Sequence, residues 1–137
     1  MLFAKMQRME QINTLHRCVI VKIDKALKAE GIQAVFMKGQ TVALRYPNPL
    51  HRTPGDIDLV VAPEDFCRTM AVMEKIGKVD HGLVHEHHGM AWVDGVTIEP
   101  HYKVHNYQRP STDQAMQEMF SSVFPTELSS ADIDGYE

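Results

Sequence analysis

The sequence has few cysteines, no long hydrophobic run and no run of basic residues, and each shortage excludes a class of protein. Its two cysteines, Cys18 and Cys67, are too few and too far apart for a disulfide framework, so we expect reduced, buried thiols. No apolar stretch approaches the roughly 20 residues that a membrane-spanning helix needs. Residues 1–10 also lack the apolar core of a signal peptide. These absences predict a cytoplasmic protein.

Charge of either sign is also limited. The formal net charge is −4, and the Lys and Arg residues are scattered along the chain. This balance argues against a broad nucleic-acid surface and against a membrane as a partner. Of 137 residues, 44% are hydrophobic and 23% are charged, as in soluble globular proteins. We therefore expect a single domain over residues 1–137.

Hydrophobic periodicity and turn residues divide the chain into helices and strands. A long amphipathic helix is expected at about 2–30, because apolar residues recur there at steps of three or four. This predicted apolar stripe consists of Leu2, Met6, Met9, Ile12, Leu15, Val19, Ile23 and Leu27. Further along, Asp94-Gly95 is typical of the two-residue turn of a β-hairpin.

The order of the expected elements predicts an α/β (α+β) fold, in which flanking helices cover a short mixed β-sheet and a β-hairpin. The core should span about 32–105, and a C-terminal helix and tail about 111–137. After the long helix we expect a buried strand at 32–37, a short helix at 40–46, a loop at 47–54, a strand at 56–62, a helix at 63–76, hairpin strands at 83–93 and 96–104, and a helix at 111–120.

Two carboxylates lie two positions apart at the start of the predicted strand 56–62. Side chains alternate along a strand, so Asp56 and Asp58 should share one face while Ile57 and Leu59 take the other. Two like charges side by side cost free energy unless a cation lies between them. A hard divalent metal such as Mg²⁺ prefers carboxylate oxygens. The alternative is a pair of solvated carboxylates at the start of a strand.

The second strand of the hairpin supplies another carboxylate, Glu99, which faces away from Ile98. If this strand lies beside the strand that begins at Asp56, Glu99 can join Asp56 and Asp58 in a site for one or two metal ions. His101 should share the face of Glu99. The alternatives are that Glu99 is only a charge on an edge strand and that His101 is a partly buried structural histidine.

Together these residues resemble the nucleotidyltransferase superfamily, and most closely its branch in which Lys-Gly precedes Arg-x-x-x-Asp-x-Asp. The resemblance covers about residues 10–105. The residues that carry it are Lys38-Gly39, Leu44, Tyr46-Pro47, Arg52, the run from Gly55 to Val61, and Ile98-Glu99-x-His101. It implies a polymerase-β-like core, a catalytic site of two metal-binding aspartates and a third carboxylate, and transfer of a nucleoside monophosphate from a nucleoside triphosphate.

The family pattern transfers to this chain residue by residue. Asp56 and Asp58 match the metal-binding aspartates, Glu99 matches the third carboxylate, and the implied cofactor is Mg²⁺ or Mn²⁺. Gly39 matches the glycine after the first strand, but Gln40 stands where superfamily members usually have Ser, which predicts weak triphosphate affinity. The implied partners are a nucleoside triphosphate and an unknown acceptor, which can be a small molecule, a protein or a polynucleotide end.

Other residues are expected to contact the nucleotide. Lys38 and Arg52 can neutralise phosphate charge, Arg52 in bidentate fashion, and His101 can contact phosphate or orient Glu99. The alternatives are a solvated lysine at 38 and an ion pair from Arg52 to Asp56 or Glu99.

Three other functions remain open from the sequence alone. Asp-x-Asp also holds a metal and a sugar nucleotide in glycosyltransferases, although only a short stretch precedes it here. A non-catalytic nucleotide- or metal-binding module of the same fold is a second alternative, favoured by Gln40. Finally, His85 and His87 share a face if they lie on a strand, and this pair suits Zn²⁺ or Ni²⁺.

Overall fold

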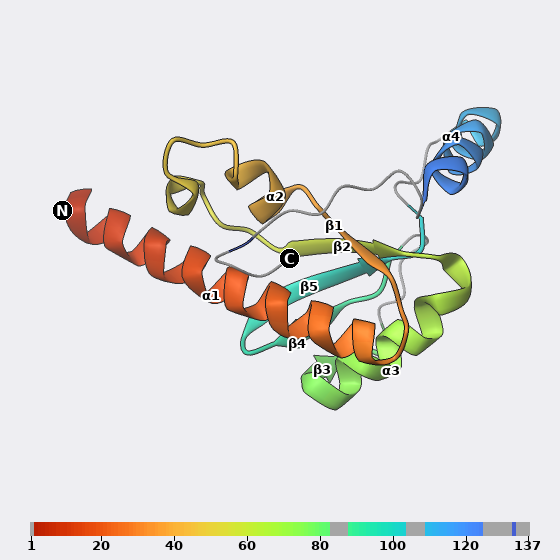
Figure 1. Ribbon diagram of the computed structural model, residues 1–137, viewed down its shortest axis with the longest axis horizontal. Helices are drawn as coiled ribbons and strands as arrows, with labels where there is room; N and C mark the ends of the chain where they lie inside the picture. Colours follow the sequence, from red (N-terminus) through yellow and green to blue (C-terminus); the bar gives the residue numbers. More distant parts are fainter. Residues whose placement is uncertain (1, 83–87, 104–108, 125–132, 134–137) are drawn as a thin grey trace.

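A computed structural model of the chain describes residues 2–82, 88–103, 109–124 and 133. Helices and strands are mixed along these residues, and three consecutive strands separate the last two α-helices (Figure 1). The elements are α1 (Leu2–Ala29), β1 (Ala34–Met37), α2 (Gly39–Ala43), the 3₁₀ turn η1 (Pro49–His51), β2 (Ile57–Val61), the 3₁₀ turn η2 (Pro63–Asp65), α3 (Phe66–Ile76), β3 (Lys78–Val79), β4 (Ala91–Val93), β5 (Val96–His101) and α4 (Pro110–Val123).

The strands form one five-stranded sheet in the order β1-β2-β5-β4-β3. β2 and β5 pair in parallel at its centre, and the other neighbouring strands pair antiparallel. The predicted short mixed sheet with flanking helices is therefore confirmed. So is the expectation that the strand of Glu99 lies beside the strand of Asp58.

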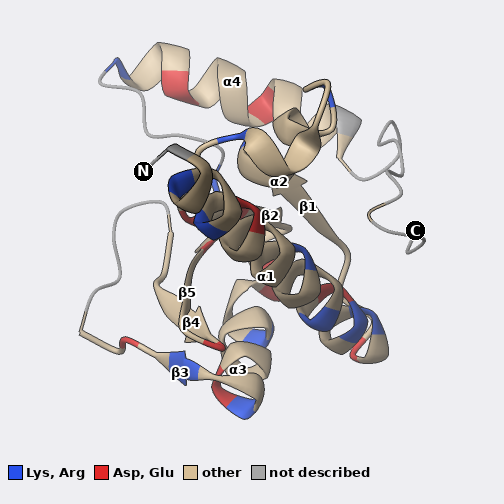
Figure 2. Cartoon of the chain, turned by 90° about the vertical axis from the view of Figure 1, so that its left-hand side faces the viewer, with Lys and Arg blue, Asp and Glu red and all other residues tan. Residues whose placement is uncertain are grey.

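Helices α1 and α3 lie side by side on one face of this sheet, whereas α4 lies apart from them (Figures 1 and 2). Alternate residues of the central strands face these helices because side chains alternate along a strand. The resulting core includes Val19, Ile23, Leu27, Ile57, Leu59, Val61, Met73 and Ile98. Asp58 and Glu99 occupy the intervening positions, so the core pattern directs both carboxylates to the opposite face.

The predicted apolar stripe of α1 is right for its second half and wrong for its first half. Leu15 is 41% exposed, and the buried positions there are polar: Asn13, His16 and Arg17. The reason is that the first half projects past the sheet and meets η1 and α2 instead of strands (Figure 1). Polar backbone and side-chain groups in those segments favour polar partners. Lys, Arg, Asp and Glu are interspersed along α1 and α3 (Figure 2).

Other differences from the predicted elements also have local causes. The strand β1 is half-buried, not buried, because it forms an edge of the sheet. The strand β3 was missed because two residues are too short for a period to be visible. Cys18 and Cys67 are exposed, so their predicted burial is wrong.

The predicted hairpin turn is confirmed. Asp94 and Gly95 have φ angles of 51° and 83° between β4 and β5, as a two-residue turn with two positive φ angles requires. The predicted parts of the hairpin at 83–87 and at 104 lie outside the described residues. Over the parts of the chain that the structure describes, no helix has the length and apolar character to cross a membrane.

Candidate functional site

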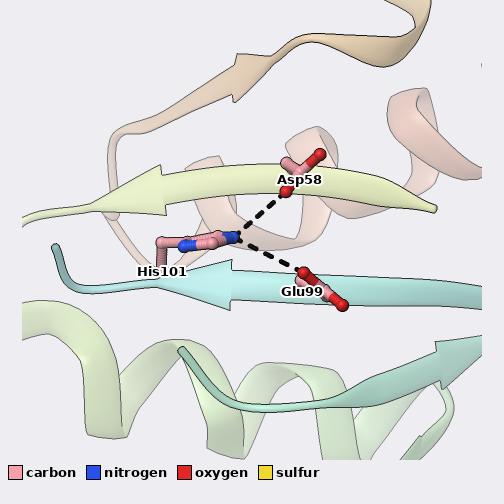
Figure 3. Close-up of side chains that lie close together, drawn as sticks. All are labelled: Asp58, Glu99 and His101. Atoms are coloured by element: carbon pink, nitrogen blue, oxygen red, sulfur yellow. Dashed lines mark hydrogen bonds and ion pairs between the residues drawn. The ribbon is translucent and has the colours of Figure 1, made fainter. Parts of the chain in front are cut away.

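The parallel pairing of β2 and β5 positions a group of polar side chains. Its register sets Asp58 beside Glu99, and Val60 beside His101. Because residues two apart on a strand share a face, Glu99 and His101 project from β5 on the side where Asp58 projects from β2 (Figure 3). The sheet thus brings together residues that are 43 positions apart in the sequence.

Asp58, Glu99 and His101 form a compact set of possible metal ligands. One donor atom from each residue lies within 4.8 Å of the others. The Nε2 atom of His101 is 3.1 Å from Oδ1 of Asp58 and 3.8 Å from Oε2 of Glu99 (Figure 3). Asp58 and His101 are each only 3% exposed, and Glu99 is half-buried. The group therefore combines two carboxylates and an imidazole in a largely buried position.

The lysine at the end of β1 completes the surroundings of Asp58. Nζ of Lys38 lies 2.9 Å from the same Oδ1 atom that His101 contacts. Burial raises the pKa of Asp58, but the hydrogen bonds from His101 and Lys38 and the charge of the lysine outweigh burial and lower the pKa. Asp58 is therefore ionised at neutral pH. The side chain of Lys38 is largely exposed, as in the solvated-lysine alternative, but its ammonium group is paired with Asp58.

Asp56 lies outside this group. It precedes β2, is exposed, and is not among the residues whose donor atoms cluster. A Cβ atom on Gly39 would lie 3.6 Å from its backbone oxygen, so the Lys38-Gly39 turn passes close to it. The charge of Asp56 also reaches His16 of α1, where it partly opposes the lowering of the histidine pKa by burial. The structure brings Asp58 and Glu99 together, and the metal-binding role of Asp56 stays a prediction.

Gln40, at the position where Ser is usual, has a buried side chain directed into the protein. Its Nε2 donates a hydrogen bond to Oδ1 of Asn13 at 2.7 Å, and Nε of Arg17 donates to its Oε1 at 3.4 Å. Both ends of the Gln40 amide are thus used internally. Gln40 therefore joins α2 to α1, and its predicted contact with a nucleotide stays a prediction.

Asn13 connects the same network to the loop that carries Arg52. Its Nδ2 donates to the backbone oxygens of Leu50 and Arg52 at 2.6 and 2.8 Å. Sequence reasoning missed this residue. Its signal was a polar residue beside the predicted stripe, with His16 and Arg17 three and four positions later on the same helix face.

Arg52 lies in this loop and forms an exposed side-chain hydrogen bond to the adjacent residue. Its Nη1 donates to the backbone oxygen of Thr53 at 3.1 Å. Within the described parts of the chain it forms no ion pair with Asp56 or Glu99, so the ion-pair alternative does not describe this structure. Its contact with phosphate stays a prediction.

The histidines of the hairpin are only partly described. His85 and His87, the predicted transition-metal pair, lie outside the described residues. His88 lies next to His101, with ring centroids 5.0 Å apart, and its Nδ1 is 3.0 Å from the backbone oxygen of Gly89. The ring of His88 therefore packs against the ring of His101.

The sheet, with a buried carboxylate on one central strand and a second carboxylate beside it, is the arrangement expected of a nucleotidyltransferase-like protein. Comparison with protein families agrees, because the model of a family described as uncharacterised nucleotidyltransferases matches residues 1–134. The chain therefore belongs to this family.

Two further comparisons complete these findings. The crystal structure of a candidate nucleotidyltransferase from Thermotoga maritima resembles this chain with a TM-score of 0.49 and 21% identity. The match covers 64% of this chain and 56% of that protein. No curated protein matches the chain.

Proposed function

We propose that this chain is a metal-dependent nucleotidyltransferase, which transfers a nucleoside monophosphate from a nucleoside triphosphate to an acceptor. The observation that carries the proposal is the parallel register that sets buried Asp58 beside Glu99, in a chain that belongs to a nucleotidyltransferase family. Membership of this family argues against the Asp-x-Asp glycosyltransferase alternative. The chemistry of the acceptor is left open.

The residues present suit a divalent metal. Two carboxylates and an imidazole offer donor atoms within 4.8 Å of one another, and Asp58 already draws a cationic partner, the ammonium of Lys38. Carboxylate oxygens favour Mg²⁺ or Mn²⁺. Asp58 and Glu99 would hold the metal, with Asp56 joining from the start of β2. When bound, metal ions in such a site activate the attacking hydroxyl and stabilise the leaving pyrophosphate.

The reaction is an in-line displacement at the α-phosphorus. An acceptor oxygen forms a bond to this phosphorus, the bond to the bridging oxygen of the β-phosphate breaks, and pyrophosphate leaves. Glu99 either completes the metal site or takes the proton of the acceptor hydroxyl, and it is our candidate for the second role because it is half-buried whereas Asp58 is almost fully buried. Lys38 and Arg52 supply positive charge for the triphosphate, and Gly39 leaves room for it because it has no side chain.

A non-catalytic module with the same fold is the second candidate. The observation that favours it is the buried side chain of Gln40, which is engaged with Asn13 and Arg17 and so does not offer a triphosphate the hydroxyl that Ser supplies at this position. Under this alternative, nucleotide and metal bind without release of pyrophosphate.

The experiment that separates the two candidates measures pyrophosphate release from each of the four nucleoside triphosphates with Mn²⁺ or Mg²⁺. Small molecules, proteins and polynucleotides are supplied as acceptors, and transfer of labelled nucleotide is followed in parallel. Glu99→Gln should reduce both signals to background. The matched control is Glu74→Gln, which removes the same charge from an exposed position on α3 and should leave both signals unchanged. Nucleotide binding without pyrophosphate release would support the non-catalytic module.

A further inference from the structure

One carboxylate oxygen of the site has two cationic or hydrogen-bonding neighbours in the metal-free protein. Oδ1 of Asp58 is 2.9 Å from Nζ of Lys38 and 3.1 Å from Nε2 of His101. A carboxylate oxygen has two lone pairs, so both acceptor positions of Oδ1 are engaged. A divalent cation that binds this oxygen must therefore replace one of the two neighbours.

The two neighbours differ in how firmly they are held. His101 is 3% exposed, belongs to β5 and has His88 against its ring. The side chain of Lys38 is 66% exposed, and a lysine side chain has four rotatable bonds through which its ammonium can move. Lys38 is therefore the neighbour that can leave without disturbing the sheet. A divalent cation on the same oxygen would also repel the ammonium.

The backbone keeps Lys38 at the site even when its side chain moves. Its carbonyl oxygen accepts hydrogen bonds from Oγ1 of Thr41 at 2.6 Å and from the backbone N–H of Val42 at 3.0 Å. Its φ angle is 51°, a conformation that non-glycine residues adopt rarely and that persists where surrounding contacts impose it. The turn is fixed, and the ammonium on its flexible stem is the part free to exchange.

We propose that Lys38 is an exchangeable counter-ion of Asp58. In the metal-free protein the ammonium of Lys38 occupies the position on Oδ1 that a divalent cation takes, and it swings outward when the cation binds. The released ammonium then lies at the rim of the site, where it can pair with a triphosphate. This second half rests on the proposed function, and it predicts that metal and triphosphate bind more tightly together than separately.

The first test uses Mn²⁺ alone, titrated by calorimetry into the wild-type protein, Lys38→Met and Lys75→Met. Lys75 is the matched control, because it also pairs with a carboxylate, that of Glu30, but lies on α3 with its side chain also 66% exposed. Lys38→Met should bind Mn²⁺ about two- to fivefold more tightly than Lys75→Met, the size expected when an ion pair of a largely exposed lysine no longer competes. Equal or weaker binding by Lys38→Met overturns the proposal.

The second test repeats the titration with a fixed concentration of inorganic tripolyphosphate, and Mn²⁺ binding to tripolyphosphate without protein is measured separately and included in the fit. Tripolyphosphate should tighten Mn²⁺ binding to the wild type and to Lys75→Met, and less so to Lys38→Met. An equal gain in all three proteins overturns the triphosphate half while the counter-ion half stands.

Further measurements test separately whether each variant is folded and whether the protein transfers nucleotide. Thermal unfolding without metal checks that each variant is folded, and Lys38→Gly, which suits a positive φ, replaces Lys38→Met if that protein does not fold. If no variant binds Mn²⁺, both this inference and the metal-dependent function are wrong. If Lys38→Met binds more tightly and no nucleotide is transferred, the counter-ion role stands and the proposed activity falls.

Discussion

The Lys38-Gly39 turn and the Asp94-Gly95 turn both pair a non-glycine residue at positive φ with a glycine at positive φ, but they differ in what requires it. In both turns a non-glycine residue with a φ angle of 51° precedes a glycine with positive φ, and no other non-glycine residue in the described ranges has positive φ. Each turn also contributes to a Lys–Asp ion pair, Lys38 with Asp58 at 2.9 Å and Asp94 with Lys22 at 2.8 Å.

The Asp94-Gly95 turn is explained by local chemistry alone. A two-residue hairpin turn needs positive φ at both positions, and Asp followed by Gly is a favoured sequence for it. Its ion-pair partners are 42% and 50% exposed. The Lys38-Gly39 turn joins β1 to α2 instead, lysine has no such preference, and its partner Asp58 is buried. A positive φ at a non-glycine residue therefore closes the hairpin in one turn, and in the other it lies at the residue whose side chain pairs with the buried Asp58.

The largest expected difference concerns metal binding by the aspartate of each ion pair, Asp58 or Asp94. Asp58→Asn should weaken Mn²⁺ binding by more than the roughly 10- to 100-fold typical of lost outer-shell partners, because it removes a charged ligand. Asp94→Asn removes the same charge from the hairpin and should leave Mn²⁺ affinity unchanged. Calorimetric titration of both proteins is the measurement. Equal effects of the two substitutions on Mn²⁺ affinity would mean that Asp58 is not a metal ligand.

Stability of the metal-free Asp58→Asn protein provides a second readout of that variant. Lys38 already balances the charge of Asp58, and His101 lies within hydrogen-bond distance of it, so the substitution should cost about 1–2 kcal/mol of unfolding free energy through weakened hydrogen bonds. A gain in stability would mean that repulsion from Glu99 dominates the site.

The next largest difference concerns how each turn is anchored to α1. Asn13→Ala should destabilise the protein by about 2–3 kcal/mol, because the oxygens of Leu50 and Arg52 and the amide of Gln40 lose a buried partner. Lys22→Ala, which releases the hairpin turn, should change stability by less than about 1 kcal/mol because its ion pair is half-exposed. Urea unfolding of both variants tests this. A loss of similar size in both would show that the polar network is not a special anchor.

Substitution of the two glycines should produce similar losses of stability and different losses of binding. Gly39→Ala and Gly95→Ala each place a side chain at positive φ, 32° and 83°, and each should cost about 1–2 kcal/mol. Only Gly39→Ala should also weaken binding of a non-hydrolysable triphosphate analogue, because its Cβ would occupy space that the proposed triphosphate position at the Lys38-Gly39 turn needs. Thermal melts and calorimetry give the two readouts. Unchanged binding by Gly39→Ala would place the triphosphate elsewhere.

The smallest expected effect is a pH dependence of the unfolding free energy that comes from His16 of α1. Burial lowers the pKa of His16, and the charge of Asp56 only partly opposes this. The unfolded chain, with a histidine pKa of about 6.5, therefore takes up a proton first as the pH falls. Unfolding free energy should decline as the pH drops below about 6.5, since the unfolded state then binds more protons. In His16→Gln this decline should be shallower, as measured by urea unfolding between pH 7 and pH 5.

The sequence was sufficient to predict features that depend on local pattern. Alternation along β2 and β5 predicted which residues face the core, and the Asp94-Gly95 dipeptide predicted the hairpin turn. The neighbourhood of Glu99 and Asp58 followed from the family resemblance and is confirmed by their register. Each of these needs only a period, a dipeptide or a known motif.

Features that depend on contacts between distant segments were not predictable in the same way. Asn13 is buried because it forms hydrogen bonds with Leu50, Arg52 and Gln40, which lie outside α1. The hydrophobic periodicity of α1 carries no information about these contacts. Likewise, the pairing of Lys38 with Asp58 depends on the exact path of the turn after β1. Asp56 and Asp58 were expected as equals because alternation gives them the same face, but Asp56 precedes the strand, where alternation no longer fixes the side chain.

The parallel pairing of β2 and β5 also determines when during folding the site comes into existence. Parallel strands cannot be joined by a tight turn, and here α3, β3 and β4 lie between them in the sequence. Such distant pairings carry a loop-closure cost, so we expect this one to form late in folding. Asp58 and Glu99 are not brought together before this step, so a metal ion should leave the refolding rate nearly unchanged and slow unfolding instead. The kinetic lifetime of the folded protein, measured by stopped-flow unfolding with and without Mn²⁺, would then report occupancy of the site without any knowledge of the acceptor.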